Sequence, residues 1–331
     1  MIVLGIESSC DETAVALVED GRKVLGQVIR SQIDTHKIYG GVVPEIASRQ
    51  HLEAIHPILD ALFEETGMSL DDVDLIAATR GPGLVGALLV GLSSARALAL
   101  AKNIPFVGVN HMEGHIAANA LSHPDLEPPF VALVVSGGHT YLLDVTDWTE
   151  MNLYGRTVDD ACGEAYDKIA RAIGLGYPGG PVVDRLAAEG EDVFHFPRVR
   201  LEKDGYDFSF SGLKTAVINR LHQAEQKGEE LDPKDVCASF QAAVTDVLME
   251  KTMALLEETG RDALVVAGGV SANRGLRGAL EAACKERGIS LYVPDFQYCT
   301  DNAAMIAAAG YFDFTSGTYD TTGHVDPNLG L

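Results

Sequence analysis

The sequence predicts an α/β protein of two lobes that share one repeated unit. Its 331 residues are enough for two domains of about 150 residues each. Apolar residues make up 47% of the chain and charged residues 22%, which is typical of a folded globular protein. Two pairs of similar segments recur in the same order along the chain, and this is the pattern that an internal duplication leaves.

The first pair of segments predicts two strand–turn–strand units. Residues 3–20 read VLGIESSCDETAVALVED, and residues 132–147 read ALVVSGGHTYLLDVTD. In each segment an apolar run stands on either side of small residues, so we expect two strands joined by a tight turn. Taken alone, this likeness is a weak sign of duplication.

The second pair strengthens the case for duplication. Segments that begin at Asp74 and Asp262, 188 residues apart, each indicate a buried strand, a glycine loop and a helix. Each is followed by a short strand and a small-residue helix, near His111 and near Asp301, which are 190 residues apart. Any α/β protein repeats strand, glycine and helix, and this alternative stays open.

The same patterns predict the lobe boundary and the helices. We expect lobes at residues 1–128 and 129–331, the second with a helical insertion at about residues 151–260. The apolar run at residues 84–101 contains Arg96, so it favours a buried helix over a membrane span. Further helices are expected at residues 44–65, 160–173, 182–188 and 235–258, and a solvated turn at 225–235. In the helix at 44–65 the candidate core positions are Ile46, Ile55, Ile58, Leu59, Leu62 and Phe63.

Charge and cysteine usage restrict the class of protein. Asp and Glu number 48 against 25 Lys and Arg, a net charge of −23, which argues against a free-standing, non-specific nucleic-acid binder. The N-terminal segment lacks the basic region of a signal peptide. We therefore expect a soluble, cytoplasmic protein without membrane contact. Reduced thiols are expected at five scattered cysteines: Cys10, Cys162, Cys237, Cys284 and Cys299.

The motif HMEGH predicts a metal site. On a helix, His111 and His115 lie about one turn apart on one face and can chelate one ion. Glu113 lies about 200° round the helix from His111, so it cannot be the base of an H-E-x-x-H peptidase. A pseudo-twofold axis would bring Asp301, from the matching helix, to the opposite wall of one cleft. Two histidines and one carboxylate are typical of Fe(II) and accessible to Zn(II), although the histidines alone also fit surface or capping positions.

Glycine-rich and small-residue loops indicate nucleotide binding. Loops between strands and helices aim backbone N–H groups at anions. Four such loops are found, and none is a Walker or a G-x-G-x-x-G loop: residues 8–12, 80–83, 136–139 and 268–273.

Three polar residues near these loops each have two interpretations. Asp184 follows Gly179 and Gly180, and it either accepts ribose hydroxyls or satisfies a helix N-terminus. Asp167 is either a ribose or substrate acceptor or half of an i,i+4 pair with Arg171. Asn273 is either an N-cap or an amide that contacts the nucleotide.

Seven motifs in register over nearly the whole chain resemble the bacterial TsaD family: ESSCDET, HMEGH, VSGGHT, EAYDKIAR, YPGGP, GGVSANR and CTDNAA. Members are tRNA N6-adenosine threonylcarbamoyltransferases, long described as O-sialoglycoprotein endopeptidases. The resemblance implies a duplicated actin-like, Hsp70-like and sugar-kinase-like (ASKHA) fold, with two lobes around a nucleotide cleft. It also implies that threonylcarbamoyl moves from threonylcarbamoyl-AMP to N6 of the adenosine 3′ to the anticodon, in tRNAs that read codons beginning with A, with release of AMP.

The resemblance also assigns residues and partners. The family's metal ligands, usually assigned to Fe(II), match His111, His115 and Asp301. Its substrate loop matches Val134, Val135, Ser136, Gly137 and Gly138, and its nucleotide contacts match Asp167, Gly180, Asp184 and Asn273. Archaeal and eukaryotic relatives carry a tyrosine at the position of Val134, so no additional side-chain ligand is expected there. The implied partners are tRNA, a TsaB-like scaffold and a TsaE-like ATPase. The helix at residues 44–65 is the candidate docking surface, or it packs only on its own lobe.

The residues favour a mechanism that is electrostatic and positional. The substrate is an activated mixed anhydride, so the protein must hold it, polarise it and stabilise the departing phosphate. Asp11, or its neighbour Glu12, is the candidate catalytic base for the N6 amine, or each is only a turn residue. The main rival is an ATP-dependent sugar or small-acid kinase of the same fold, which has no need of the histidine pair. A non-catalytic scaffold would lack metal ligands, and a zinc peptidase is disfavoured by the position of Glu113.

Overall fold

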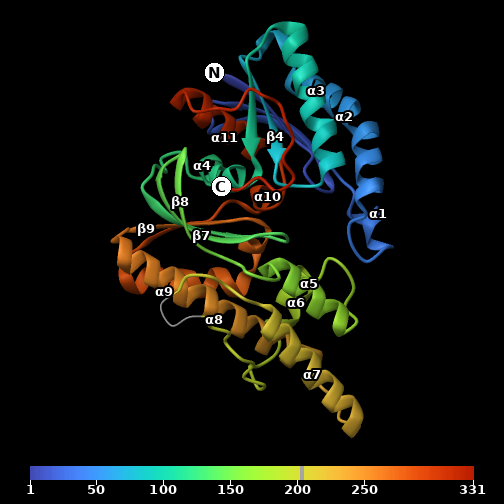
Figure 1. Cartoon of the computed structure of the whole chain (residues 1–331), viewed down its shortest axis with the longest axis vertical. Helices are drawn as coiled ribbons and strands as arrows, with labels where there is room; N and C mark the ends of the chain where they lie inside the picture. Colours follow the sequence, from blue (N-terminus) through green and yellow to red (C-terminus); the bar gives the residue numbers. More distant parts are fainter. Residues whose placement is uncertain (202–204) are drawn as a thin grey trace. The chain divides into compact units, whose positions relative to one another are not determined.

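The protein, described from a computed structural model, divides into two units (Figure 1). The structure describes residues 1–201 and 205–331. Unit 1 comprises Met1–Pro128, Thr146–Met151 and Val293–Leu331, and unit 2 comprises Pro129–Val145 and Asn152–Tyr292. The first boundary lies where the sequence places the start of the second lobe, whereas the C-terminal segment belongs to unit 1.

Unit 1 contains a mixed five-stranded sheet in the order β3-β2-β1-β4-β5. Strands β1 to β3 form an antiparallel meander, and β4 and β5 run parallel to β1. The predicted strand–turn–strand segment is therefore present, extended by the edge strand β3. The strands are β1 Ile2–Glu7, β2 Glu12–Glu19, β3 Lys23–Ser31, β4 Leu75–Gly81 and β5 Phe106–Asn110.

The sheet of unit 2 repeats this arrangement in the order β8-β7-β6-β9-β10. Strands β6 and β7 are antiparallel, while β6, β9 and β10 are parallel. Each strand takes the place of its counterpart in unit 1, so the topology confirms the internal duplication. The strands are β6 Phe130–Val135, β7 Thr140–Asp147, β8 Glu150–Arg156, β9 Ala263–Ala267 and β10 Ser290–Tyr292.

Helices cover both faces of the unit 1 sheet. Side chains of β1 alternate between the faces, so Val3 packs in the core with α4 and α11, and Leu4 packs with α2 and α3. Four of the six candidate core residues of α2 are buried, and Ile46 and Phe63 are half-buried. The helices are α1 Ile33–Lys37, α2 Pro44–Thr66, α3 Val85–Lys102, α4 His111–Ser122, α10 Phe296–Cys299 and α11 Ala303–Ser316, with a 3-10 turn at Leu70–Asp72.

Among the described residues, α3 is the one helix long and apolar enough to cross a membrane, with a mean hydropathy of 1.4. Leu88, Leu92 and Ala95 are among its buried residues, and the helix packs against α2 and β4. A core helix of a soluble protein has the same length and composition, so this finding is weak evidence for a membrane span.

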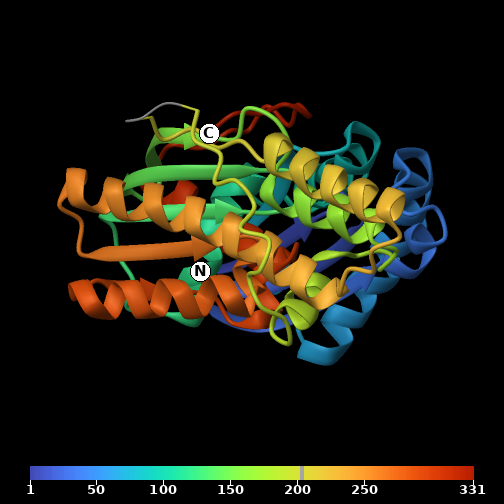
Figure 2. The same cartoon turned by 90° about the horizontal axis from the view of Figure 1, so that it is seen from below.

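In its described residues, the insertion in unit 2 contains four helices where the sequence predicts three. The missed helix, α7, buries only Leu213, Val217 and Ala224, so its apolar pattern is weak. It ends at Lys227, inside the predicted solvated turn, because Gly228 terminates it at a φ of 64°. Helices α8 and α9 run side by side (Figures 1 and 2). The helices are α5 Cys162–Ala172, α6 Gly180–Ala187, α7 Ser211–Lys227, α8 Pro233–Thr259 and α9 Arg274–Arg287, with a 3-10 turn at Gly269–Ala272.

The C-terminal helix α11 lies directly on β1 and β4. This close packing requires small residues, because a Cβ atom on Gly5 would lie 2.2 Å from the Ala303 carbonyl oxygen and one on Gly310 would lie 2.4 Å from the Cβ of Ala77. Residues 129–331 therefore do not form one unit, in contrast to the expected boundary. Since α11 packs against α4, the segments near residues 111 and 301 meet within unit 1.

Candidate functional site

Two histidines enter the candidate metal centre from the start of α4. Strand β5 ends at Asn110, whose side-chain oxygen accepts a hydrogen bond from the Met112 N–H at 2.9 Å and so caps the helix. The helix then begins at His111, and His115 follows one turn later on the same face. Both histidines are buried. Helix capping thus places the predicted pair at the carboxyl edge of the parallel strands, where α/β sheets bind ligands.

The third member, Asp301, comes from the turn before α11. Asn302 fixes this turn, because its side-chain NH₂ donates to the Thr300 carbonyl at 2.8 Å and its oxygen accepts from the Met305 N–H at 2.9 Å. The sequence predicts that the carboxylate and the histidines lie on opposite walls of a cleft. That prediction is wrong, since all three residues belong to unit 1.

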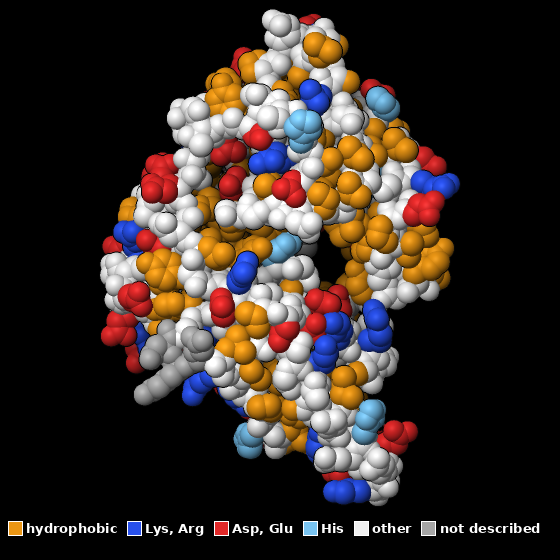
Figure 3. Space-filling model, viewed as in Figure 1, with side chains coloured by type: hydrophobic (Ala, Val, Ile, Leu, Met, Phe, Trp, Pro, Cys, Tyr) orange, Lys and Arg blue, Asp and Glu red, His pale blue; other side chains and the backbone are white. Residues whose placement is uncertain are grey.

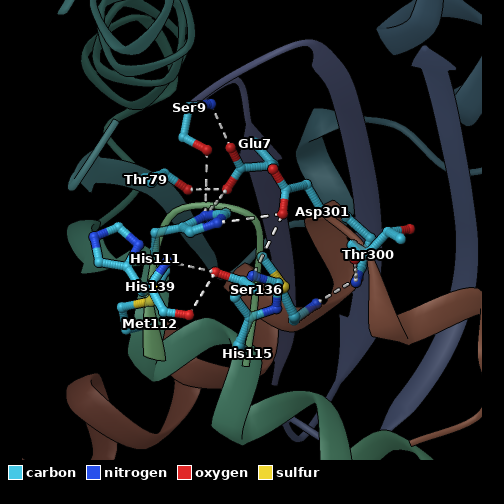
Figure 4. A network of polar contacts seen from close by, with 12 residues as sticks. Glu7, Ser9, Thr79, His111, Met112, His115, Ser136, His139, Thr300 and Asp301 are labelled. Carbon is cyan, nitrogen blue, oxygen red and sulfur yellow. Dashed lines mark hydrogen bonds and ion pairs between the residues drawn. The ribbon is translucent and has the colours of Figure 1, made fainter. Parts of the chain in front are cut away.

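The three side chains point toward one another (Figure 4). The Nε2 atoms of His111 and His115 each lie 3.3 Å from the same oxygen, Oδ1 of Asp301. Two donors that bind one ion at about 2.1 Å lie roughly 3.0 to 3.4 Å apart for right-angled to tetrahedral geometry, so this spacing suits one shared ion.

The surroundings of His115 also fit a metal ion. His115 is 1% exposed, and its Nε2 faces Oδ1 of Asp301 in an ion-pair contact, but neither ring nitrogen makes a hydrogen bond among the described residues. A buried polar atom without a partner costs about 1–3 kcal/mol, so it calls for an explanation such as an absent ion. Coordination by one ring nitrogen would remove that cost.

Glu7, at the end of β1, completes the site, and the sequence analysis did not single it out. Its carboxylate lies 3.0 Å from Nδ1 of His111 and accepts a hydrogen bond from the Thr79 hydroxyl at 2.5 Å. Its other oxygen accepts from the Ser9 N–H. A carboxylate at Nδ1 fixes the tautomer of His111 that leaves Nε2 available to a metal. The one sign of this role in the sequence is that Glu7 is an acidic residue at the end of an apolar strand. In the structure Glu7 is fully buried.

Opposite charges within the site shift its pKa values. Burial alone would raise the pKa of Asp301, but the facing imidazoles of His111 and His115 hold it well below its usual range. Burial opposes charge on His111 as well, yet the carboxylates of Asp301 and Glu7 raise the pKa of His111 well above its usual value. For His115, burial dominates and lowers the pKa. Without a metal, His111 therefore holds a proton between two ionised carboxylates while His115 is neutral, and an ion that binds Nε2 of His111 displaces that proton.

In unit 2, the candidate nucleotide residues are hydrogen-bonded by the chain itself. Asn273 caps α9, because its Oδ1 accepts from the Leu276 N–H at 2.8 Å, and its Nδ2 donates to Oε1 of Gln241 at 2.7 Å. Asp184 accepts from Nε of Arg274 at 2.9 Å and from Nε2 of Gln241 at 3.3 Å. Both residues thus have structural roles, and Gln241, which the sequence analysis missed, connects them.

Asp167 and the adjacent glycines form a second part of this region. Oδ1 of Asp167 accepts from the Gly179 N–H at 2.7 Å. Burial raises the pKa of Asp167, and the backbone N–H groups of the two glycines oppose this shift. A Cβ on Gly179 would lie 2.4 Å from the Cβ of Ala170, whereas one on Gly180 would meet nothing within 4 Å. Gly179 is therefore required for packing, and Gly180 leaves the start of α6 open.

The predicted substrate loop divides into a buried and an open part. Val134 and Val135 lie in β6 with fully buried side chains, so only their backbone is available to a ligand. Ser136 turns the chain toward β7, and its N–H donates to the His139 carbonyl at 2.9 Å. A Cβ on Gly137 or Gly138 would meet nothing within 4 Å, so this turn has an accessible backbone.

Comparison with known proteins identifies the family. The family model TsaD, tRNA N6-adenosine threonylcarbamoyltransferase, matches residues 23–308. The chain belongs to the TsaD family. A curated relative named tRNA N6-adenosine threonylcarbamoyltransferase, from Caldicellulosiruptor bescii, is 57% identical over 318 residues, which cover 96% of this chain and 94% of that protein. A relative of the same name from Clostridioides difficile is 51% identical over 331 residues, which cover 99% and 98%.

Solved structures support the fold assignment for this TsaD-family chain. Full-length HypF in its phosphate- and nucleotide-bound form has a TM-score of 0.65 at 14% identity, over 96% of this chain and 47% of HypF. Component A of (R)-2-hydroxyglutaryl-CoA dehydratase from Acidaminococcus fermentans has a TM-score of 0.55 at 16% identity, over 94% and 98%. These neighbours have the actin-like fold, so the expected ASKHA fold class is confirmed.

Proposed function

We propose that this enzyme transfers the threonylcarbamoyl group from threonylcarbamoyl-AMP to N6 of the adenosine 3′ to the anticodon, in tRNAs that read codons beginning with A. The product is N6-threonylcarbamoyladenosine. The observation that carries the proposal is the triad of His111, His115 and Asp301 in a chain of the TsaD family. A kinase of the same fold is disfavoured, because phosphoryl transfer relies on Mg²⁺, which prefers oxygen ligands to imidazoles.

His111, His115 and Asp301 would hold one divalent metal ion, for which we propose Fe(II), with Zn(II) as the alternative. When bound, the ion supplies Lewis-acid polarisation of phosphate or carbamoyl oxygens. Glu7 holds the imidazole of His111 in the orientation that binding needs. Three protein ligands leave coordination positions for substrate.

The nucleotide part of the substrate is assigned to unit 2. The departing adenylate gains negative charge, which backbone N–H groups of an open turn can stabilise. The accessible backbone at Gly137, Gly138 and Gly180 supports this role. The nucleotide would be contacted by Asp167, Asp184 and Asn273. Each would use the lone pairs or N–H groups of its side chain that are not already taken by hydrogen bonds within the chain. Val134 and Val135 would contribute backbone groups only.

Transfer also needs a base that takes a proton from the attacking N6 amine. We assign this role to Asp11, in the turn between β1 and β2. The same turn carries Ser9, whose hydroxyl lies 3.3 Å from Nδ1 of His111. The adjacent Glu12 is suited to hold a proton, because burial and the charges of Asp301 and Asp11 raise its pKa to about 9. The substrate is already activated, so we propose direct transfer without a covalent enzyme intermediate.

The partners follow from charge and surface. A net charge of −23 opposes tRNA binding by the chain alone, so we propose a complex with a TsaB-like scaffold and a TsaE-like ATPase in the cytoplasm. Hydrophobic side chains gather over α2 and α3 in Figure 3, and Leu52 and Val85 are 64% and 53% exposed. This patch supports α2 as the docking surface for the scaffold.

At physiological salt the isolated chain should bind tRNA weakly. Tight binding and repeated turnover by the chain alone would exclude a partner requirement.

The activity can be tested by incubating the purified, metal-loaded chain and its partners with threonylcarbamoyl-AMP and tRNA. Digestion to nucleosides and mass spectrometry should then detect N6-threonylcarbamoyladenosine. A matched reaction with ATP and a panel of sugars should yield no phosphorylated product. Absence of the modified nucleoside from the complete reaction would refute the proposal.

A further inference from the structure

A buried histidine outside the metal triad connects α2 to the turn between β1 and β2. His51 is fully buried, and both of its ring nitrogens have partners. Its Nε2 lies 2.9 Å from the Cys10 carbonyl oxygen, and its Nδ1 lies 2.8 Å from the Thr13 hydroxyl. Because a carbonyl only accepts hydrogen bonds, Nε2 carries the proton and Nδ1 accepts from the hydroxyl.

The turn at residues 8–11 is held by three hydrogen bonds to successive carbonyl groups. The Ser9 carbonyl accepts from the Leu84 N–H at 2.8 Å, and the Asp11 carbonyl accepts from the Gln32 N–H at 3.0 Å. The Cys10 carbonyl between them accepts from His51. Of these three donors, two are backbone groups, and the imidazole is the one that a substitution can remove.

The same turn contacts the metal centre. The Ser9 hydroxyl lies 3.3 Å from Nδ1 of His111, and the Ser9 N–H donates to Glu7. Asp11, the assigned base, is two residues further along the chain. A shift in the Cys10 peptide would therefore displace a neighbour of the metal ligand on one side and the base on the other.

We propose that His51 is a positioning residue for the transfer reaction. Its Nε2–H holds the Cys10 carbonyl so that the turn presents Ser9 and Asp11 to the metal centre. This inference rests on the proposed function, in which Asp11 takes the proton from the N6 amine. Misplacing a reacting group by about 1 Å can cost about 100-fold in rate, so a second-layer hydrogen bond at this point has a measurable effect.

The other contacts of α2 allow this role to be separated from a role in folding. Ile55, Ile58 and Leu62 bury the helix against the sheet independently of His51. In His51→Gln, the amide NH₂ lies at about the position of Nε2 and can still donate to the Cys10 carbonyl. In His51→Asn, the shorter side chain places its amide at about the position of Nδ1 and cannot reach that carbonyl. Thr13→Val removes the second contact alone. His222, exposed on α7 and away from the proposed docking surface, provides the matched control His222→Gln.

The experiment measures kcat and KM for transfer, metal content and melting temperature for these variants of the full chain with its partners. We expect His51→Asn to lower kcat by about tenfold or more, with KM within about twofold and full metal content. His51→Gln, Thr13→Val and His222→Gln should keep most of the wild-type kcat.

Three results would overturn the inference. Wild-type kcat in His51→Asn would show that the hydrogen bond to Cys10 has no effect on transfer. Equal losses in His51→Asn and His51→Gln, in proportion to lower melting temperatures, would assign His51 to folding alone. Failure of the wild-type and His222→Gln proteins to make product would remove the proposed function itself, and this inference with it. The control protein therefore distinguishes the two failures.

Discussion

The two units share one sheet topology but differ in how their candidate ligand residues are satisfied. In unit 1, two imidazoles converge on one oxygen of Asp301, and the ring nitrogens of His115 have no hydrogen-bond partner among the described residues. In unit 2, the side chains of Asp184 and Asn273 are hydrogen-bonded by α8 and α9. The first set is incomplete without a ligand, and the second is complete without one.

This difference indicates what each set contributes to stability. A polar group that lacks a partner costs free energy until a ligand binds, whereas a helix cap stabilises the fold at all times. Substitution of His115 should therefore affect ligand binding far more than folding. Substitutions at Asp184 or Asn273 should affect both.

The largest effect is expected from removing a triad ligand. His111→Ala or Asp301→Ala should lower bound metal well below one ion per chain. Transfer should fall by more than the roughly 10–100-fold loss that is typical when a residue hydrogen-bonded to a metal ligand is changed. The fold should survive with a lower melting temperature, because each change leaves a buried charge without its partner. Metal content by mass spectrometry, with the exposed-site variant His56→Ala as control, checks this. Full occupancy in both variants would break the contrast between the units.

A smaller loss is expected when the outer partner of His111 is changed. Glu7→Gln keeps the shape of the side chain but removes the charge that orients Nδ1 of His111. We expect metal affinity to fall by about 10–100-fold, while the triad itself stays intact. Competition with a metal chelator measures this affinity. An unchanged affinity would limit Glu7 to a structural role at the end of β1.

Variants in unit 2 sharpen the contrast from the other side. Asn273→Ala and Asp184→Ala should weaken adenylate binding by about tenfold or more, the effect of losing a hydrogen bond of about 1.5–3 kcal/mol to a charged group. Asn273→Ala should also lower the free energy of unfolding by about 1 kcal/mol, because it removes the cap of α9. Metal content should not change. Calorimetry measures the affinity for AMP, with the exposed-site variant Asn152→Ala as control. An unaltered affinity in both variants would show that Asn273 and Asp184 have structural roles only.

The smallest effect concerns a buried acid that holds a proton instead of a metal. Burial and the nearby Glu113 raise the pKa of Asp313 to about 8 from its ordinary value of 3.8. Between these pH values the unfolded chain loses the proton that the folded state keeps, so stability falls as pH rises. Asp313→Asn should therefore have a higher melting temperature than the wild type. The difference between the two proteins should be a few degrees larger at pH 8 than at pH 5. An equal difference at both pH values would contradict this, and exposed Asp34→Asn serves as control.

The sequence predicts the parts that depend on local pattern. The strand–turn–strand segments, the helices at α2, α3, α5, α6 and α8, and the spacing of His111 and His115 all follow from apolar periodicity and helix geometry. Helix α7 was not predicted, because a mostly exposed helix has few apolar residues at helical spacing. The edge strands β3 and β8 were missed for the same physical reason, since exposure on one side weakens the alternation.

What the sequence could not predict depends on packing between distant segments. The return of α11 to unit 1 rests on the fit of Ala303 against Gly5, which no local pattern records. That return places Asp301 beside the histidines instead of across a cleft. Glu7 and Gln241 are likewise single polar residues in apolar or helical runs, and their roles arise only from partners in other segments.

The central claim, that His111, His115 and Asp301 share one metal ion, is tested most directly by anomalous diffraction from crystals of the purified protein. An X-ray fluorescence scan identifies the metal, and a difference map at its absorption edge locates it. We predict one peak within coordination distance of both Nε2 atoms and of Oδ1 of Asp301. A metal-loaded, active protein whose anomalous peak lies elsewhere, or is absent, would contradict the account.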